Sequence, residues 1–310
     1  MTMKISKNHS LLLFFGISIF ITSCSDSLSD TTDGRLRYWI STLSSDEFEG
    51  RAPGTEGGKL TKNFISKTFQ DLNLDPVDGS YFLDVPASEI TLKDSSYLTL
   101  SFRGNDRKMI TGEEVVFWTK QAREYRKIRD SEVVFVGYGI VAPEYNWNDY
   151  DGIDVKGKTV VILINDPGFA TGKLRLFNGK SMTYYGRWTY KFEEAARQGA
   201  AAAIVIHEEE PAAYPWSVVE NSWQGPQLDL QRDDLGADRV ILEGWIRDST
   251  LNDVLNFTGF NYDSLKEIAL EKTFSAFPLR GLTLSSEIHN KVRYLQSHNI
   301  AAVKKGSTHP

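Results

Sequence analysis

Two amphipathic helices are predicted near the start of the folded chain. Leu36, Trp39, Ile40 and Leu43 lie at i, i+3, i+4 and i+7, which puts them on one face of a helix. A second set of apolar residues with the same period runs from residue 60 to 72 and ends before a proline. We therefore expect a pair of helices, each with one apolar face.

A glycine-rich loop separates these two helices. It has the sequence SSDEFEGRAPGTEGG, and its glycines can take positive φ and bring the backbone close to another element or a ligand. One interpretation is a loop at the edge of a cleft, with Gly50, Arg51, Gly54 and Thr55 as candidate site residues. The other is a tight helix–helix connection with Arg51 in solvent.

Alternating and continuous apolar runs predict strands in the middle of the chain. Residues 97–102 alternate with period two and lead into a turn at 103–106. Residues 132–140 (EVVFVGYGI) are predicted to form one strand. The uninterrupted apolar runs at 159–164 and 200–206 are typical of strands buried on both faces.

A helix is predicted at residues 190–198, between the last two strands, and Gly199 is a suitable helix stop. Strand, connection, helix and strand in this order are typical of a βαβ unit, so the predicted class is α/β.

The last part of the chain contains a further helical stretch and then returns to strand patterns. The helical stretch lies within 255–272, and strands are predicted at 282–288 and 294–303. Within the second, residues 299–303 are expected to be a short buried strand, followed by a polar turn. The sequence stops three residues after that turn, and we interpret this ending as a truncation.

The first 23 residues have the pattern of a bacterial secretion signal. Lys4 and Lys7 precede an apolar run of 11 residues, 11–21, which is shorter than the roughly 20 needed to cross a bilayer. The run leads to Ile21-Thr22-Ser23-Cys24, which resembles the lipobox in which a cysteine is acylated and becomes the new N-terminus. We predict a signal peptide at 1–23, lipidation at Cys24 and a polar tether at 24–34.

Composition narrows the possible partners. The formal charge is −6, and removing residues 1–23 takes away two lysines and no acid, which changes it to −8. A chain without a basic stripe is not expected to bind nucleic acid. Cys24 is the only cysteine, so a disulfide within one chain is impossible.

No complete catalytic set emerges from the residues themselves. His207 precedes three glutamates and could bind a metal, but a solvated acidic loop explains this pattern better. Glu193 and Glu194 point in different directions on a helix, which favours a solvated face over a glycosidase pair. Gly137-Tyr138-Gly139 lacks the third glycine of a dinucleotide loop. We assign no catalytic and no metal-binding residue.

Two segments carry a resemblance to a known family. Residues 43–58 resemble the N-terminal motif of exported di-zinc aminopeptidases of metallopeptidase family twenty-eight, which are related to glutamate carboxypeptidase II. Residues 131–210 are similar to the protease-associated domain that these enzymes insert. The resemblance implies the start of a zinc-exopeptidase α/β sandwich, interrupted by a β-rich α+β domain. Residues 299–307 would then be the first strand and turn of the peptidase sheet.

The resemblance also sets expectations about cofactors. The family holds two zinc ions through His, Asp and Glu ligands, which polarise the scissile carbonyl and activate a water. In this family those ligands, and the catalytic glutamate, begin beyond the position that corresponds to Pro310. Two zinc ions are therefore expected for the complete family member and none for this chain alone.

These observations give a domain plan and two hypotheses. The plan has peptidase-domain helices and strands at 35–111, a protease-associated domain at 112–250 that folds by itself, and a return to the peptidase domain at 251–310. The first hypothesis is the N-terminal portion of a lipid-anchored zinc aminopeptidase, inactive alone, that faces the periplasm or cell surface. The alternative is a non-catalytic lipoprotein that binds peptides or a protein partner through the protease-associated domain.

Overall fold

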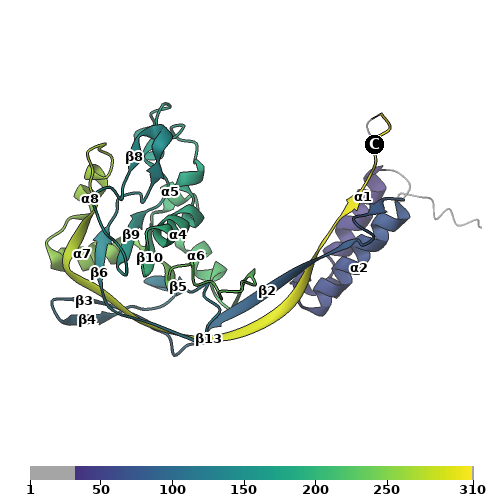
Figure 1. The fold of residues 1–310 in the computed structure, drawn as a ribbon, viewed down its shortest axis with the longest axis horizontal. Coiled ribbons are helices and arrows are strands. Elements are labelled where there is room, and N and C mark those ends of the chain that lie inside the picture. The colour runs from purple at the N-terminus through teal and green to yellow at the C-terminus, as the bar shows by residue number, and fades with distance from the viewer. Residues whose placement is uncertain (1–31, 309–310) are drawn as a thin grey trace, which may run out of the picture. The chain divides into compact units, whose positions relative to one another are not determined.

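The computed structural model describes residues 32–308, which divide into two compact units, 32–68 and 69–308 (Figure 1). The predicted signal peptide and Cys24 lie outside the described residues. Each unit is therefore described by itself.

The first unit contains the two predicted helices, except for the last three residues of the second helix. They are α1 (Thr32–Leu43) and α2 (Glu56–Asp71), joined by a 3₁₀ helix, η1 (Asp46–Arg51). Phe64 of α2 packs against both other helices, because its ring lies 6.1 Å from that of Tyr38 in α1 and 6.0 Å from that of Phe48 in η1. The apolar face predicted on α1 is partly exposed in the described unit: Leu36 is 47% and Ile40 is 65% exposed, while Trp39 and Leu43 are half-buried. Packing runs through Tyr38 and Phe48 instead of the predicted stripe.

The second unit is mixed α/β. Its strands are β1 (Asp75–Pro76), β2 (Phe82–Leu92), β3 (Tyr97–Phe102), β4 (Asn105–Lys108), β5 (Val115–Trp118), β6 (Tyr125–Phe135), β7 (Val141–Ala142), β8 (Trp147–Asn148), β9 (Thr159–Leu163), β10 (Ala202–His207), β11 (Pro226–Leu230), β12 (Leu242–Arg247), β13 (Phe277–Ile300) and β14 (Ala302–Val303). Its helices are η2 (Pro143–Tyr145), α3 (Pro167–Thr171), η3 (Tyr184–Gly186), α4 (Trp188–Arg197), α5 (Glu209–Ala212), α6 (Trp216–Ser222), α7 (Asp248–Thr258) and α8 (Tyr262–Ile268).

A ten-stranded mixed sheet organises the second unit. The strand order is β11-β2-β13-β6-β9-β10-β12-β5, with the β3–β4 hairpin on β13. The four strands β6, β9, β10 and β12 are parallel to one another. The predicted βαβ unit is confirmed, since β9 and β10 are parallel neighbours joined through α4.

The parallel strands are covered on both faces. Figure 1 shows α4 and α6 on one side of them and α7 and α8 on the other. Side chains alternate between two apolar clusters: Val161 and Leu163 join the cluster of α7 and α8, while Val160 and Ile162 join that of α4. A strand with both faces buried needs an uninterrupted apolar sequence, so the strand at 159–164 could be predicted from its apolar run.

Two strand boundaries differ from the prediction. The strand expected at 132–140 begins at Tyr125 and ends at Phe135, because Gly137 and Gly139 take φ of 56° and 60°, which breaks the extended chain. The strands expected at 282–288 and 294–303 are one long strand, β13, followed by β14. Residues 299–303 are not buried in the described chain, since Val303 is 43% exposed.

The region predicted as 112–250 shares its core with residues on both sides of it. Its strand β6 pairs with β13, and its apolar cluster includes Leu98, Leu100 and Leu284. The two ends of the region lie together, because β5 pairs with β12 and the amide of Arg247 donates to the carbonyl of Glu114 at 3.2 Å.

Candidate binding site

The predicted loop residues lie at the helix–helix connection of the first unit. Thr55 caps α2: its Oγ1 accepts a hydrogen bond from the amide of Gly58 at 3.1 Å and donates to the carbonyl of Ala52 at 2.7 Å. The guanidinium of Arg51 donates to the carbonyl of Leu43, at the end of α1. The side chains of Arg51 and Thr55 are exposed and also bond the connection, so the cleft-edge role of this loop stays a prediction.

The glycines of this loop meet two different demands. Gly50 and Gly54 take φ of 72° and 74°, where side chains with a Cβ are strained. Gly57 lies in α2 with ordinary φ, but a Cβ there would stand 2.1 Å from the carbonyl oxygen of Phe48. The glycine-rich sequence is thus explained by backbone geometry at both kinds of position.

The acidic residues weighed as catalytic candidates lie in two different environments. The prediction of a solvated face was wrong for Glu194, which is 5% exposed. Its carboxylate accepts hydrogen bonds from Arg197 Nε at 2.9 Å and Gln198 Nε2 at 2.7 Å. Glu193 accepts from the Tyr184 hydroxyl at 2.6 Å. The bonds from Arg197 and Gln198 replace the hydration that the Glu194 carboxylate loses on burial. Two adjacent acids in the sequence do not indicate such bonds.

A pocket of about 390 Å³ lies at the carboxyl ends of the parallel strands. Tyr138 follows β6, Asn165 and Asp166 follow β9, and Glu208 follows β10, and all four line this pocket. Carboxyl ends of parallel strands are the usual ligand position in open α/β sheets, because the loops diverge there. We call this space the strand-end pocket.

Buried hydrogen bonds fix the floor of the strand-end pocket. The carboxylate of Asp166 caps α3 by accepting from the amides of Gly168 at 3.0 Å and Phe169 at 3.2 Å, and it accepts from the Thr183 hydroxyl at 2.8 Å. Beneath it, Lys191 of α4 is fully buried and its Nζ donates to the carbonyls of Tyr138 at 2.7 Å and Asn165 at 2.8 Å. Lys191 thus joins the loops after β6 and β9.

Burial also shifts the titration of these inner groups. Burial lowers the pKa of Lys191, because the ammonium form loses solvation, and the nearby Asp149 and Asp166 carboxylates oppose this only in part. Burial raises the pKa of Asp149, while the amide of Ile140 and the indole N–H of Trp147 bond its charged form. Neither group is free to contact a ligand, so both serve the frame of the site.

Two ion pairs border the strand-end pocket. Lys266 Nζ of α8 lies 2.9 Å from Glu208 Oε1, and Lys180 Nζ lies 3.8 Å from Glu210 Oε1 of α5. Burial lowers the pKa of Lys266, but its bonds to Glu208 and Asp263 outweigh this and raise the pKa overall. The pocket therefore offers both signs of charge, brought together from three separate segments of the chain.

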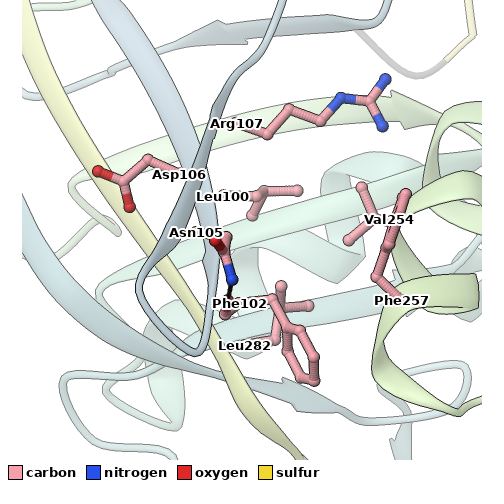
Figure 2. Close-up of a pocket in the computed structure, with 8 residues that line it drawn as sticks. All are labelled: Leu100, Phe102, Asn105, Asp106, Arg107, Val254, Phe257 and Leu282. Atoms are coloured by element: carbon pink, nitrogen blue, oxygen red, sulfur yellow. Dashed lines mark hydrogen bonds between the residues drawn. The ribbon is translucent and has the colours of Figure 1, made fainter.

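A second cavity, of about 310 Å³, lies beside the β3–β4 hairpin. Figure 2 shows Leu100, Phe102 and Leu282 on its strand side and Val254 and Phe257 on its helix side. Arg107 also lines it, but the guanidinium is bonded to Glu114 Oε1 at 2.5 Å. Its lining is mainly apolar, so we take the strand-end pocket as the better candidate for specific recognition.

The zinc ligands expected for the complete family are not gathered in residues 32–308. No group of three or more His, Cys, Asp or Glu side chains in this range could hold a metal ion. His207, weighed as a ligand, ends β10 and its Nε2 lies 3.1 Å from the carbonyl oxygen of Tyr214. The same described range contains no helix both long and apolar enough to cross a membrane.

Comparison with known proteins finds similarity among solved structures. No protein-family model matches the chain, and no curated protein matches it. Among solved structures, the aminopeptidase from Aneurinibacillus sp. strain AM-1 is similar, with a TM-score of 0.40 and 18% sequence identity. The similarity covers 87% of this chain and 50% of that one, so this chain spans about half the length of that protein.

Proposed function

We propose that this chain is the N-terminal portion of a lipid-anchored, zinc-dependent aminopeptidase, with residues 112–250 as an inserted protease-associated domain. The activity comes from the resemblance of residues 43–58 and 131–210 to that family. In this proposal the protein is exported, held to a bacterial membrane through Cys24, and acts on peptides in the periplasm or at the cell surface. The zinc ligands are supplied by residues beyond Pro310.

One feature of the fold carries the proposal. The segments that flank residues 112–250 pair with each other: β2 pairs with β13 over residues 82–92, and β3 pairs with the same strand. An insertion requires the two flanking segments to lie side by side, as these strands do, and β6 and β11 of the inserted region extend the same sheet. The adjacent ends of the region, on β5 and β12, meet the same requirement.

The experiment is to purify the protein from its native source and measure its zinc content and its aminopeptidase activity. A tag inserted in the part of the tether before residue 32 lies ahead of α1 and allows purification. We expect a product longer than 310 residues, with about two zinc ions per chain and activity that a chelator removes. A native product that ends at Pro310, without zinc or activity, would contradict the proposal.

The second candidate is the non-catalytic binding lipoprotein. The strand-end pocket favours it, because a pocket with a fixed floor and charged borders can bind a ligand without any catalytic residue. A native product that ends at Pro310, has no zinc and no activity, and binds peptides or a protein partner would establish this alternative.

A further inference from the structure

The two ion pairs of the strand-end pocket differ greatly in exposure. The side chains of Lys266 and Glu208 are 35% and 18% exposed and lie 2.9 Å apart. Those of Lys180 and Glu210 are 68% and 81% exposed and lie 3.8 Å apart. The inner pair therefore belongs to the wall of the pocket, whereas the outer pair stands at its mouth.

The outer pair can exchange its partners at little cost. Exposed ion pairs contribute little to stability, since water solvates both charges well. The Lys180 ammonium keeps a second contact, because its Nζ lies 5.0 Å from the ring centroid of Phe169. A ligand that brings one charge of each sign can thus replace the Lys180–Glu210 contact with two contacts of its own.

The space between these charges is partly apolar. Ile164, Phe169 and Leu270 line the same pocket, and each is buried or half-buried. An aliphatic side chain placed there would leave water, which is favourable in proportion to the apolar surface that it buries. A volume of about 390 Å³ is at the small end of the range for ligand pockets, which suits a single amino acid better than a long peptide.

Buried hydrogen bonds fix the frame of the pocket. Asp166 and Lys191 are fully buried and hydrogen-bonded to the loops that carry Tyr138, Asn165 and Phe169. A site whose walls are held in place loses less conformational entropy when a ligand binds.

We propose that the strand-end pocket binds a free α-amino acid with an apolar side chain, with its ammonium on Glu210 and its carboxylate on Lys180. The short separation of the two charges in an α-amino acid suits two side chains that lie 3.8 Å apart. This site does not rest on the hydrolase proposal. If that proposal holds as well, the ligand belongs to the class of products that the enzyme releases.

Calorimetric titration of the purified chain with leucine, leucinamide and N-acetylleucine tests this site. Leucinamide lacks the carboxylate and N-acetylleucine lacks the ammonium, so each should bind about fivefold more weakly than leucine, or worse. Glu210→Gln should weaken leucine binding and remove the preference over N-acetylleucine. Lys180→Met should weaken leucine binding and remove the preference over leucinamide.

Both substituted side chains are exposed, so the variants are expected to fold. Matched controls are Glu56→Gln and Lys59→Met, which change an equally exposed ion pair of 3.4 Å in the first unit and should leave leucine binding unchanged. The proposal is overturned if leucine does not bind, if the three compounds bind equally, or if either variant keeps both preferences. If the protein binds leucine and shows no aminopeptidase activity, this site stands and the hydrolase proposal fails. If it shows activity and does not bind leucine, the hydrolase proposal stands and this site fails.

Discussion

His207 shows how one buried side chain can make the stability of this protein depend on pH. It is 2% exposed, and its ring nitrogen lies 3.1 Å from the carbonyl oxygen of Tyr214. Burial lowers the pKa of His207, and this outweighs the opposing effects of the Tyr214 carbonyl, Asp248 and Glu209. The unfolded chain, with an ordinary pKa of 6.5, then binds this proton at higher pH than the folded chain.

Lowering the pH through 6.5 should therefore favour the unfolded state. Stability falls as the pH falls wherever the unfolded chain binds more protons than the folded chain. We predict that His207→Gln loses less unfolding free energy than the parent chain between about pH 7.5 and about pH 5.5. Urea unfolding at the two pH values measures the loss of unfolding free energy for each chain. The contributions of the other titrating groups are the same in both chains and cancel when the two losses are compared. His289→Gln, at a more exposed histidine, is the control. Equal losses in the parent and His207→Gln would contradict the prediction.

At the scale of elements, Lys191 links a helix to two strands. It stands on α4, and its Nζ bonds the carbonyls of residues that follow β6 and β9. Its removal would leave two buried carbonyls unpaired and Asp149 buried without an opposing charge. The bond thus holds the floor of the strand-end pocket and contributes to the fold at the same time.

We predict that Lys191→Met lowers the unfolding free energy by about 3 kcal/mol, the cost typical of breaking a buried charge contact. The same substitution at exposed Lys180 should change it by less than about 0.5 kcal/mol. Denaturant unfolding of both variants gives the comparison. A similar small effect at the two positions would show that Lys191 does not hold the strand ends.

The elements that could be predicted from the sequence are those with a local signal. The apolar run at 159–164 and the Gly199 stop needed only neighbouring residues, and β9 and α4 lie where expected. The first half of β6 was missed because Arg126, Lys127 and Arg129 interrupt the apolar pattern on a strand that β13 stabilises from far along the chain. Tertiary pairing decided that strand.

The candidate site was harder to predict for the same reason. Its charges come from three segments that lie far apart in the sequence, and these meet only because three parallel strands end together: Lys180, Glu208 with Glu210, and Lys266. The neighbouring glutamates in the sequence suggested that Glu208 is exposed to solvent. In the structure its side chain is 18% exposed and pairs with Lys266. The loop at 44–58 could be predicted as special from its glycines, but the backbone geometry explains those glycines without any ligand.

At the scale of the whole molecule, anchoring depends on Cys24, which lies outside the described residues. We predict that Cys24→Ser abolishes incorporation of a fatty-acid probe and blocks signal cleavage, because only the thiol accepts the diacylglycerol. Metabolic labelling followed by gel mobility measures both. Ser25→Ala, which keeps the thiol, should be labelled like the parent chain. Label that persists in Cys24→Ser would refute the anchor.

The central claim is that catalysis requires ligands supplied by residues beyond Pro310. Its most direct test is hydrolysis of an aminoacyl chromogenic substrate by residues 24–310 alone and by the same residues joined to the segment encoded directly downstream. Two zinc ions need several ligands around a shared water, so we predict no release by the chain alone and chelator-sensitive release by the joined protein. Chelator-sensitive activity from residues 24–310 alone, or none from the joined protein, would contradict the account.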